Sequence, residues 1–410
     1  MTKVAVRRLG DISSFIRGIT FKPTDVVPAD TPSAVGCMRT KNVQTQLDIS
    51  DVWSVDSGFV RRAEQYLEEG DVLISSANSW NLVGKCCWIP KLESATSFGG
   101  FVTALRGDEN LVDRRYLYRW FASAGTQKTV RSFSRQTTNI SNLDLKRCAD
   151  LPVPLPSLVE QRRIAAVLDQ VDTLRAKRRE AIALLDDLAQ SIFLDMFGDP
   201  DEGWLDVSVG ELAVAGKNGI RTGPFGSQLL REEFTEEGVA VLGIDNAVQN
   251  EFAWSGRRFI STEKYRQLAR YKVNPGDLLI TIMGTCGRCA VVPDDIPLAI
   301  NTKHLCCITL DRAKCLPEFL HSYFLMHPVS RRYLAQTAKG AIMAGLNMGI
   351  IKALPVRLPP LDLQQKYVSR VEKVRKVRAQ QEEHLTALDE LFESLQQRAF
   401  SGKLWDHEAA

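Results

Sequence analysis

One segment of this chain occurs twice, and this duplication constrains the fold more than any other feature. Leu151-Pro-Val-Pro-Leu-Pro156 returns as Leu354-Pro-Val-Arg-Leu-Pro359, an offset of 203 residues, and the register then continues without a gap from Gln161 and Gln364 onward. A period near 200 residues is far too long for a solenoid repeat. We therefore expect two copies of a unit, each made of one domain and one helix and joined head to tail.

The composition is that of an ordinary globular protein. With 410 residues the chain has room for about two to three domains, and its 44% hydrophobic and 25% charged residues are typical values. No apolar run approaches the ~20 residues that span a bilayer, and the first residues lack the apolar stretch of a signal peptide. We expect a cytoplasmic protein. A net charge of only +3 does not by itself indicate nucleic-acid binding, so the distribution of charge has to be considered.

Each repeated segment leads into a long helix. In the first copy Ser157 precedes Glu160 by three residues, which is a capping-box pattern. Apolar residues then recur every three or four positions, which predicts two coiled-coil helices of roughly 35–40 residues, about 55 Å long. The predicted seam contains Ile164, Val171, Leu174, Arg178, Leu185 and Leu188 in the first helix, and Val374, Val377, Gln381, Leu388 and Leu391 in the second. The two polar members, Arg178 and Gln381, either fix the register or extend out of the seam, and both interpretations remain open.

The charge along the helices predicts their relative direction. Each helix is basic in its first part and acidic in its last part; Arg175 and Arg378 belong to the basic parts, and Asp186 and Asp389 to the acidic parts. Parallel pairing would place like charges together, whereas antiparallel pairing places opposite charges together. Antiparallel pairing also brings the termini of the intervening domain close together, as in most compact domains.

The predicted organisation is a domain over residues 1–157, a central helix over 158–199, a second domain over 200–360 and a C-terminal helix over 361–403. Both domains contain Gly-Asp before an apolar strand, at Gly70-Asp71 and Gly276-Asp277, and a later Gly-basic-Cys turn, at Gly84 and Gly287. Short strands punctuated by Gly and Pro predict an α+β class. Outside these shared phrases the domains differ, as expected of two related modules that recognise different targets.

The sequence contains no familiar catalytic signature. We find no phosphate-binding loop, dinucleotide fingerprint, zinc-protease motif or nucleophile elbow. Pro293-Asp-Asp295 followed by Lys303 has a slight likeness to a nuclease cluster, but a surface turn explains it more simply. The nine cysteines of a cytosolic chain should be reduced. Cys286 and Cys289 have metal-ligand spacing. The sequence lacks a second such pair, so we favour small apolar residues packed in strands over a zinc site. We expect a binding protein without chemistry of its own.

The chain resembles the specificity subunit of type I restriction-modification systems. Three features carry the resemblance: the duplicated Leu-Pro-x-x-Leu-Pro, the glutamine that follows it at the start of each long helix, and the Gly-Asp before an apolar strand. The resemblance covers the whole chain. It implies two target recognition domains that each bind one half of a bipartite, asymmetric double-stranded DNA target. It also implies an antiparallel coiled coil that sets the gap and docks two methyltransferase subunits, with restriction (motor) subunits as further partners. S-adenosylmethionine and ATP would act on those partners, and this chain would hold no cofactor, no metal and no catalytic residue.

Residue types that contact phosphates and bases cluster in both domains. In the first domain the predicted DNA-binding residues are Arg131, Arg135, Gln136, Thr137 and Asn139, then Asn78, Asn81 and Lys85, and finally Arg61 and Arg62. In the second domain they are Arg221, Ser227, Gln228, Arg288, Lys303, His304 and Lys339. A competing hypothesis is a coiled-coil scaffold that joins protein partners without sequence-specific DNA binding, which the modest net charge permits.

Overall fold

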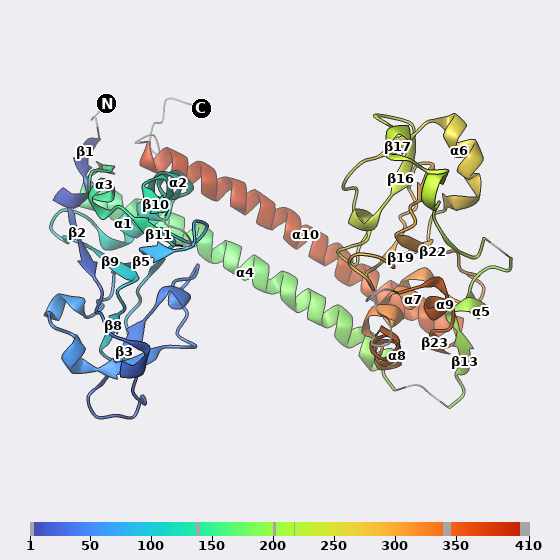
Figure 1. Ribbon diagram of the computed structural model, residues 1–410, viewed down its shortest axis with the longest axis horizontal. Helices are drawn as coiled ribbons and strands as arrows, with labels where there is room; N and C mark the ends of the chain where they lie inside the picture. The colour runs from blue at the N-terminus through green and yellow to red at the C-terminus, as the bar shows by residue number, and fades with distance from the viewer. Residues whose placement is uncertain (1–3, 137–139, 200–201, 217, 339–345, 402–410) are drawn as a thin grey trace. The chain divides into compact units, whose positions relative to one another are not determined.

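The computed structural model describes residues 4–136, 140–199, 202–216, 218–338 and 346–401 (Figure 1). The chain divides into two compact units, of which the first combines Met1–Arg179 with Glu383–Ala410 and the second is Glu180–Glu382. Each unit therefore contains one mixed domain and a segment of each long helix. Within the described part of the chain, no helix is long and apolar enough to cross a membrane.

The described residues of the first domain form four small sheets and three short α-helices before the long helix. The strands are β1 Ala5–Arg8, β2 Ser13–Arg17, β3 Ala34–Met38, β4 Trp53–Asp56, β5 Val72–Ser75, β6 Ala77–Asn78, β7 Cys86–Trp88, β8 Thr96–Phe98, β9 Val102–Gly107, β10 Ser134–Gln136, β11 Ser141–Leu143 and β12 Pro152–Leu155. The helices are α1 Arg114–Phe121, α2 Ala124–Ser132 and α3 Leu145–Ala149, and the long helix α4 spans Leu158–Phe197. The sheets have the orders β1-β12, β2-β9-β5-β7, β4-β3-β8 and β10-β11-β6.

The second domain repeats much of this plan. Its strands are β13 Leu205–Ser208, β14 Ile220–Thr222, β15 Phe234–Thr235, β16 Val239–Leu242, β17 Phe259–Ile260, β18 Lys272–Val273, β19 Leu278–Thr281, β20 Cys289–Val291, β21 Ala299–Asn301, β22 Leu305–Ile308 and β23 Pro355–Leu358. Its helices are α5 Val209–Leu212, α6 Thr262–Leu268, α7 Pro317–Met326, α8 Pro328–Ala338 and α9 Met348–Lys352, and the long helix α10 spans Leu361–Phe400. The sheets have the orders β13-β23, β14-β22-β19-β20 and β15-β17-β16-β21-β18.

The Gly-Asp phrase has the same structural role in both domains. Gly70 and Gly276 adopt φ values of 96° and 76°, which a residue with a side chain rarely adopts. The next residue is a buried aspartate in each case, and it pairs with an arginine of the same sheet. Asp71 pairs with Arg106 of the adjacent strand β9 at 2.7 Å, whereas Asp277 pairs with Arg221 of β14, on the far side of β22, at 2.7 Å. These ion pairs join the strands of the two central sheets.

A buried glutamine joins each domain to the long helix that follows it. Gln161 accepts a hydrogen bond from the backbone N–H of Asp113 at 2.7 Å, and its amide donates to the carbonyl of Pro156 at 2.8 Å. Gln364 accepts from Leu316 N–H at 2.8 Å and donates to Pro359 at 2.9 Å. All of these partners are related by the 203-residue offset, so the duplication extends to individual hydrogen bonds.

Within each unit the two helical segments run in opposite directions. In the first unit Arg175 of α4 pairs with Asp389 of α10 at 2.5 Å, and in the second Arg378 pairs with Asp186 at 2.7 Å. From Arg175 to Asp186 the sequence of α4 advances, whereas their partners go back from Asp389 to Arg378 in α10, which is the order of an antiparallel pair. The predicted α+β class and the antiparallel pairing are therefore confirmed.

The seam between the helices follows a strict alternation of four and three residues. The buried and half-buried positions that fit this alternation are 164, 168, 171, 175, 178, 182, 185, 189, 192 and 196 in α4, and 364, 367, 371, 374, 378, 381, 385, 388, 392, 395 and 399 in α10. Further buried and half-buried positions, such as Ala165, Ala181 and Phe193, lie beside them. The predicted seam positions Leu174, Leu188, Val377 and Leu391 are wrong, because these side chains are 41–46% exposed. Each is displaced by one residue from a true seam position. The predicted positions Arg178 and Gln381 are half-buried.

Candidate nucleic-acid interface

Two of the predicted groups in the first domain come together at one small sheet. Strand β11 pairs with β10, which carries Arg135 and Gln136, and also with β6, where Ser141 lies opposite Asn78. Asn78 donates to the Ser75 hydroxyl at 3.0 Å, which holds its amide at the end of β5. Polar side chains from segments some sixty residues apart in sequence thus share one surface. Thr137 and Asn139 lie outside the described residues.

The side chains at this surface are accessible to solvent, and few acidic groups neutralise the basic ones. Arg135 is 82% exposed, and its ion pair with Asp144 at 3.0 Å is of the surface type that contributes little to stability. Gln136 and Asn81 are exposed, and the Lys85 ammonium donates to Gln44 Oε1 at 2.5 Å. A phosphate or base edge could therefore displace the present partners at small cost.

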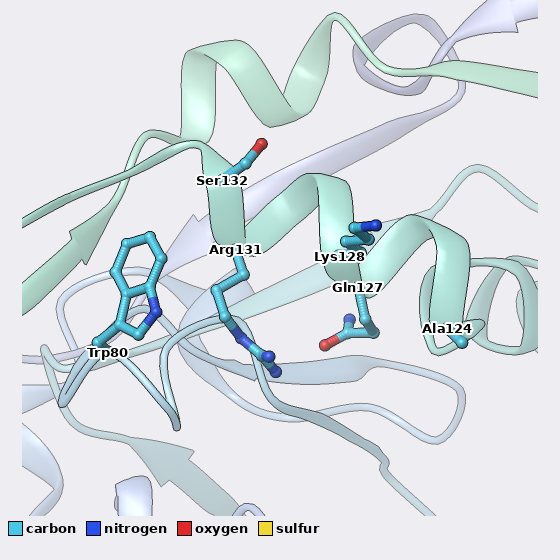
Figure 2. Close-up of a pocket in the computed structure, with 6 residues that line it drawn as sticks. All are labelled: Trp80, Ala124, Gln127, Lys128, Arg131 and Ser132. Carbon is cyan, nitrogen blue, oxygen red and sulfur yellow. The ribbon is translucent and has the colours of Figure 1, made fainter.

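Helix α2 and the turn after β6 enclose a pocket of about 540 Å³ beside this sheet. Its lining consists of Trp80, Ala124, Gln127, Lys128, Arg131 and Ser132. Gln127 and Arg131 extend from one side of α2 toward the turn that carries Trp80 (Figure 2). The sequence interpretation included Arg131 and the asparagines on either side of Trp80, but it missed Trp80, Gln127 and Lys128. A tryptophan inside a polar turn was the available signal.

Arg61 and Arg62 occupy a different part of the first domain. Both are exposed, and their backbone N–H groups donate to Gln65, whose amide donates to the Arg17 carbonyl at the end of β2. Arg62 also forms an ion pair with Glu64 at 2.8 Å. This anchoring places them beside β2, whereas Asn78 is on β6.

In the second domain the backbone segments that carry Arg288, Lys303 and His304 lie next to the paired ends of β19 and β22. The Arg288 N–H donates to the Thr281 hydroxyl at 2.9 Å, and the Ile282 N–H donates to the His304 carbonyl at 2.9 Å. Lys303 therefore lies beside the turn that carries Arg288. Burial, with Lys303 and Arg258 nearby, lowers the pKa of His304 below its ordinary value, so its imidazole is neutral near pH 7.

The loop after β14 packs against the same region. A Cβ at Gly223 would lie 2.0 Å from the carbonyl oxygen of Asn301, so only glycine permits this close approach. Ser227 and Gln228 follow on the exposed loop, and Gln228 Oε1 accepts from the Tyr271 hydroxyl at 2.9 Å. Lys339 lies outside the described residues.

Arg221 requires a correction. Its side chain is only 7% exposed, and its guanidinium donates to Asp277, to the Asn218 carbonyl and to the Thr309 hydroxyl. These bonds hold the guanidinium inside the sheet, so Arg221 has no free surface for DNA. The sequence showed a basic residue in a loop-like phrase, whereas the structure shows the interior partner of a buried aspartate. We leave Arg221 out of the candidate interface.

Four of the five cysteines in the second domain, Cys289, Cys306, Cys307 and Cys315, are buried, and Cys286 is half-buried. Burial raises the pKa of Cys306 to about 12 and also raises that of Cys289, so both thiols stay protonated near neutral pH. Metal binding requires thiolates. Among the residues that the structure describes, no group of three His, Cys, Asp or Glu side chains lies together as potential metal ligands.

Comparison with known proteins agrees with this architecture. Residues 1–184 and 226–389 match the family model of the type I restriction modification DNA specificity domain. The specificity subunit of the type I restriction enzyme StySPI from Salmonella potsdam is 24% identical over 98% of this chain and 89% of its own length. The EcoKI specificity subunit from Escherichia coli strain K12 is also 24% identical, over 96% of this chain and 87% of its own length.

The fold is also found in solved structures. The S subunit of a type I restriction-modification system from M. genitalium superposes with a TM-score of 0.58 at 15% identity, over 97% of this chain and 96% of that one. A chain from a study of type I complex assembly and conformational transition gives a TM-score of 0.57 at 16% identity, over 98% of each chain. The duplicated domains, the antiparallel helices and the matching family model together identify the chain as a member of the type I restriction-modification specificity subunit family.

Proposed function

We propose that each domain recognises one half of an asymmetric, interrupted DNA target. The observation that carries this proposal is the combination of a duplicated frame with different exposed side chains. The first domain presents Arg135 and Gln136 at the β10-β11-β6 sheet and Asn81 on the turn after β6, and the second presents the exposed Arg288 and the half-buried Lys303 near the end of β19. Equivalent scaffolds with different polar groups are suited to two different half-sites.

In this proposal the coiled coil sets the gap between the half-sites. Both long helices have 40 residues, which corresponds to about 60 Å at 1.5 Å per residue. The uninterrupted four-three seam and its two symmetric ion pairs make each helix segment stiff in its own unit. A stiff spacer of defined length would favour one gap over others.

The coil also carries a duplicated set of exposed apolar side chains on which methyltransferase subunits could dock. Leu174 is equivalent to Val377, and Leu188 to Leu391, under the 203-residue offset. Each unit contains one member of each pair: Leu174 and Leu391 in the first, Leu188 and Val377 in the second. Two copies of one partner would find the same surface twice, as expected for two methyltransferase subunits.

The remaining parts of the proposal concern chemistry. We infer that the chain is non-catalytic, holds no cofactor, and leaves S-adenosylmethionine and ATP to methyltransferase and restriction subunits. The absence of sequence motifs for nucleotide or metal chemistry supports this inference, and so does the burial of the cysteine thiols. The same complex would act on DNA in the cytoplasm.

Sequencing of modified bases in cells that express the chain with its methyltransferase subunits tests the proposal. The expected result is a two-part adenine-methylation motif with an unspecified gap. Arg135→Ala with Gln136→Ala should relax only one half of the motif, and Arg288→Ala with Lys303→Ala should relax only the other. Each double variant is the control for its counterpart. Methylation without any sequence preference, or relaxation of both halves by either variant, would contradict the proposal.

A further inference from the structure

The pocket at helix α2 has a charge pattern unlike that of its surroundings. Lys128 and Arg131 contribute two cations to the lining, and none of the six lining residues is acidic. Within the described residues neither side chain forms an ion pair, although Arg115 and Arg119 of the neighbouring helix α1 are both paired with Asp169. The Nε atom of Arg131 is buried and has no hydrogen-bond partner. The pocket therefore offers an uncompensated positive charge to an anion.

One wall of the same pocket is aromatic. Trp80 is 45% exposed, and its indole lies across the pocket from the α2 side chains (Figure 2). A large exposed aromatic ring beside unpaired cations is typical of sites that bind nucleotides, because the ring stacks on a base while the cations contact the phosphate. The pocket, of about 540 Å³, is open to solvent.

The position of Trp80 is repeated in the second domain. Trp80 stands four residues before Gly84, and Met283 stands four residues before Gly287. Both glycines have a left-handed backbone, with φ of 83° and 81°, and both donate to the last residue of the preceding strand at 2.9 Å. Met283 is 41% exposed. A large apolar side chain thus stands at the same distance before the glycine in both turns.

We propose that this pocket binds a single nucleotide of the target whose base has left the helical stack. The base would lie against the indole of Trp80, and its phosphate would contact Arg131 and Lys128. Gln127 donates its amide to the Phe121 carbonyl at 2.9 Å, so its Oε1 atom faces the pocket as an acceptor for a base edge. The inference rests on the proposed DNA recognition and deepens it by naming the form of DNA that the first domain holds.

An intact duplex does not satisfy this site. Base faces in a duplex are covered by their neighbours, so an indole can stack on one only after that base is unstacked. Unstacking costs a few kcal/mol in general, and stacking on an aromatic side chain recovers a comparable amount. Two free cations beside the ring would hold the distorted backbone in place.

The test uses the full chain with its methyltransferase subunits and the target identified by methylation mapping. A set of duplexes removes one base at a time from the strand opposite each nucleotide of the first half-site. At the nucleotide that enters the pocket, the loss of its pairing partner should tighten binding about tenfold, because unstacking becomes easier. Trp80→Ala should abolish this gain and weaken binding to the intact target about tenfold. Trp80→Phe should retain most of the gain and most of the affinity for the intact target.

Leu82→Ala is the matched control, because Leu82 is 45% exposed on the same turn but does not line the pocket. It should leave the affinity unchanged. A free nucleotide is the alternative source of the ligand. Quenching of the Trp80 emission by a deoxynucleoside monophosphate, with Trp80→Phe as the reference, would show that a free nucleotide binds. If Trp80→Ala also leaves the affinity for DNA unchanged, the proposal that the pocket binds a nucleotide of the DNA target is overturned.

The outcomes separate this inference from the proposed function. If no duplex is bound with sequence preference, DNA recognition itself fails. If the wild-type complex binds its target specifically and Trp80→Ala binds each duplex, modified or intact, with the same affinity as the wild type, only the nucleotide pocket fails.

Discussion

Arg175 of helix α4 and Asp389 of helix α10 form an ion pair with an Nε to Oδ1 distance of 2.5 Å, and residues at the equivalent positions form a second one. Adding 203 to Arg175 gives Arg378, and subtracting 203 from Asp389 gives Asp186, and these residues pair at 2.7 Å. Such reciprocity arises only when the two helices run in opposite directions in the same register in both units. The two ion pairs are therefore equivalent contacts, related by the internal duplication of the chain.

These pairs should contribute modestly to stability. The side chains of Arg175 and Asp389 are 18% and 40% exposed, so solvent screens the attraction, and we expect a coupling free energy of roughly 0.5–1 kcal/mol. A double-mutant cycle of Arg175→Ala and Asp389→Ala in chemical denaturation measures it and removes the separate contribution of the Arg175 guanidinium packed over Phe392. The Arg378 and Asp186 cycle is the internal control and should give a similar value. A coupling near zero in both cycles would show that the charges do not stabilise the pairing.

The buried glutamines should contribute more to the free energy of unfolding than the ion pairs do. Gln161→Ala leaves the N–H of Asp113 and the carbonyl of Pro156 without partners in a buried site, and each unpaired group is costly. We expect a loss of about 2–3 kcal/mol in the free energy of unfolding, and a similar loss for Gln364→Ala. Gln190→Ala, at an exposed helix position, should change stability by less than about 0.5 kcal/mol. Unequal losses for the two buried glutamines would contradict their equivalence.

Arg221 should act through stability and not through DNA contact. Arg221→Ala leaves the buried Asp277 carboxylate unpaired, which costs about 3–5 kcal/mol for a pair of this kind. Thermal unfolding measures the loss, and the folded fraction should retain the wild-type preference for the second half-site. A variant with unchanged stability but relaxed recognition of that half would restore Arg221 to the DNA surface.

Acidification should destabilise the second unit. Nε2 of the buried His321 lies 2.8 Å from the Asn250 carbonyl and 3.0 Å from that of Cys289, so it carries the single proton of a neutral ring. Burial is the main cause that lowers the pKa of His321, and also that of His327, below the ordinary value of 6.5. The unfolded chain therefore binds these protons first, and stability that is present above pH 6.5 should decrease as the pH falls below it.

Melting curves at pH 7.5 and pH 5.5 test this expectation. His321→Gln keeps a donor for the two carbonyl groups but does not titrate, so it should reduce the difference between the two melting temperatures. A wild-type protein that becomes more stable over this interval would contradict the assignment of a neutral His321.

The length of the coil should determine the gap in the target. Removing one heptad from each helix, residues 179–185 and 379–385, preserves the four-three phase of the seam and shortens the coil by about 10 Å, or about three base pairs. The methylation motif should then show a shorter gap with unchanged half-sites. Removing four residues from each helix is the control, because it breaks the seam and should abolish activity. An unchanged gap after the heptad deletion would refute the spacer role.

The arrangement of the candidate site was only partly accessible from sequence. The polar phrases at Asn78 and at Arg131 to Gln136 were visible separately, because each is a local cluster. Their meeting at β11, and the pocket that Trp80 completes, depend on strand pairing between distant segments. Arg221 was misinterpreted for the same reason, since its partner Asp277 is 56 residues away and its burial is a property of the whole sheet.

The sequence by itself determined the duplication, the two long helices, the α+β class and the antiparallel direction. Repeats, apolar periodicity and charge gradients are patterns of residues along the chain, so they can be recognised without the fold. Only the tertiary structure decided which apolar stripe forms the seam. By hydrophobicity alone Leu174 and Val377 are better seam residues than their neighbours Arg175 and Arg378. The arginines occupy the seam because carboxylates on the opposite helix neutralise them, and Phe392 covers the guanidinium of Arg175. A charge enters a half-buried position only when a partner is already there, and that partner is supplied by the fold.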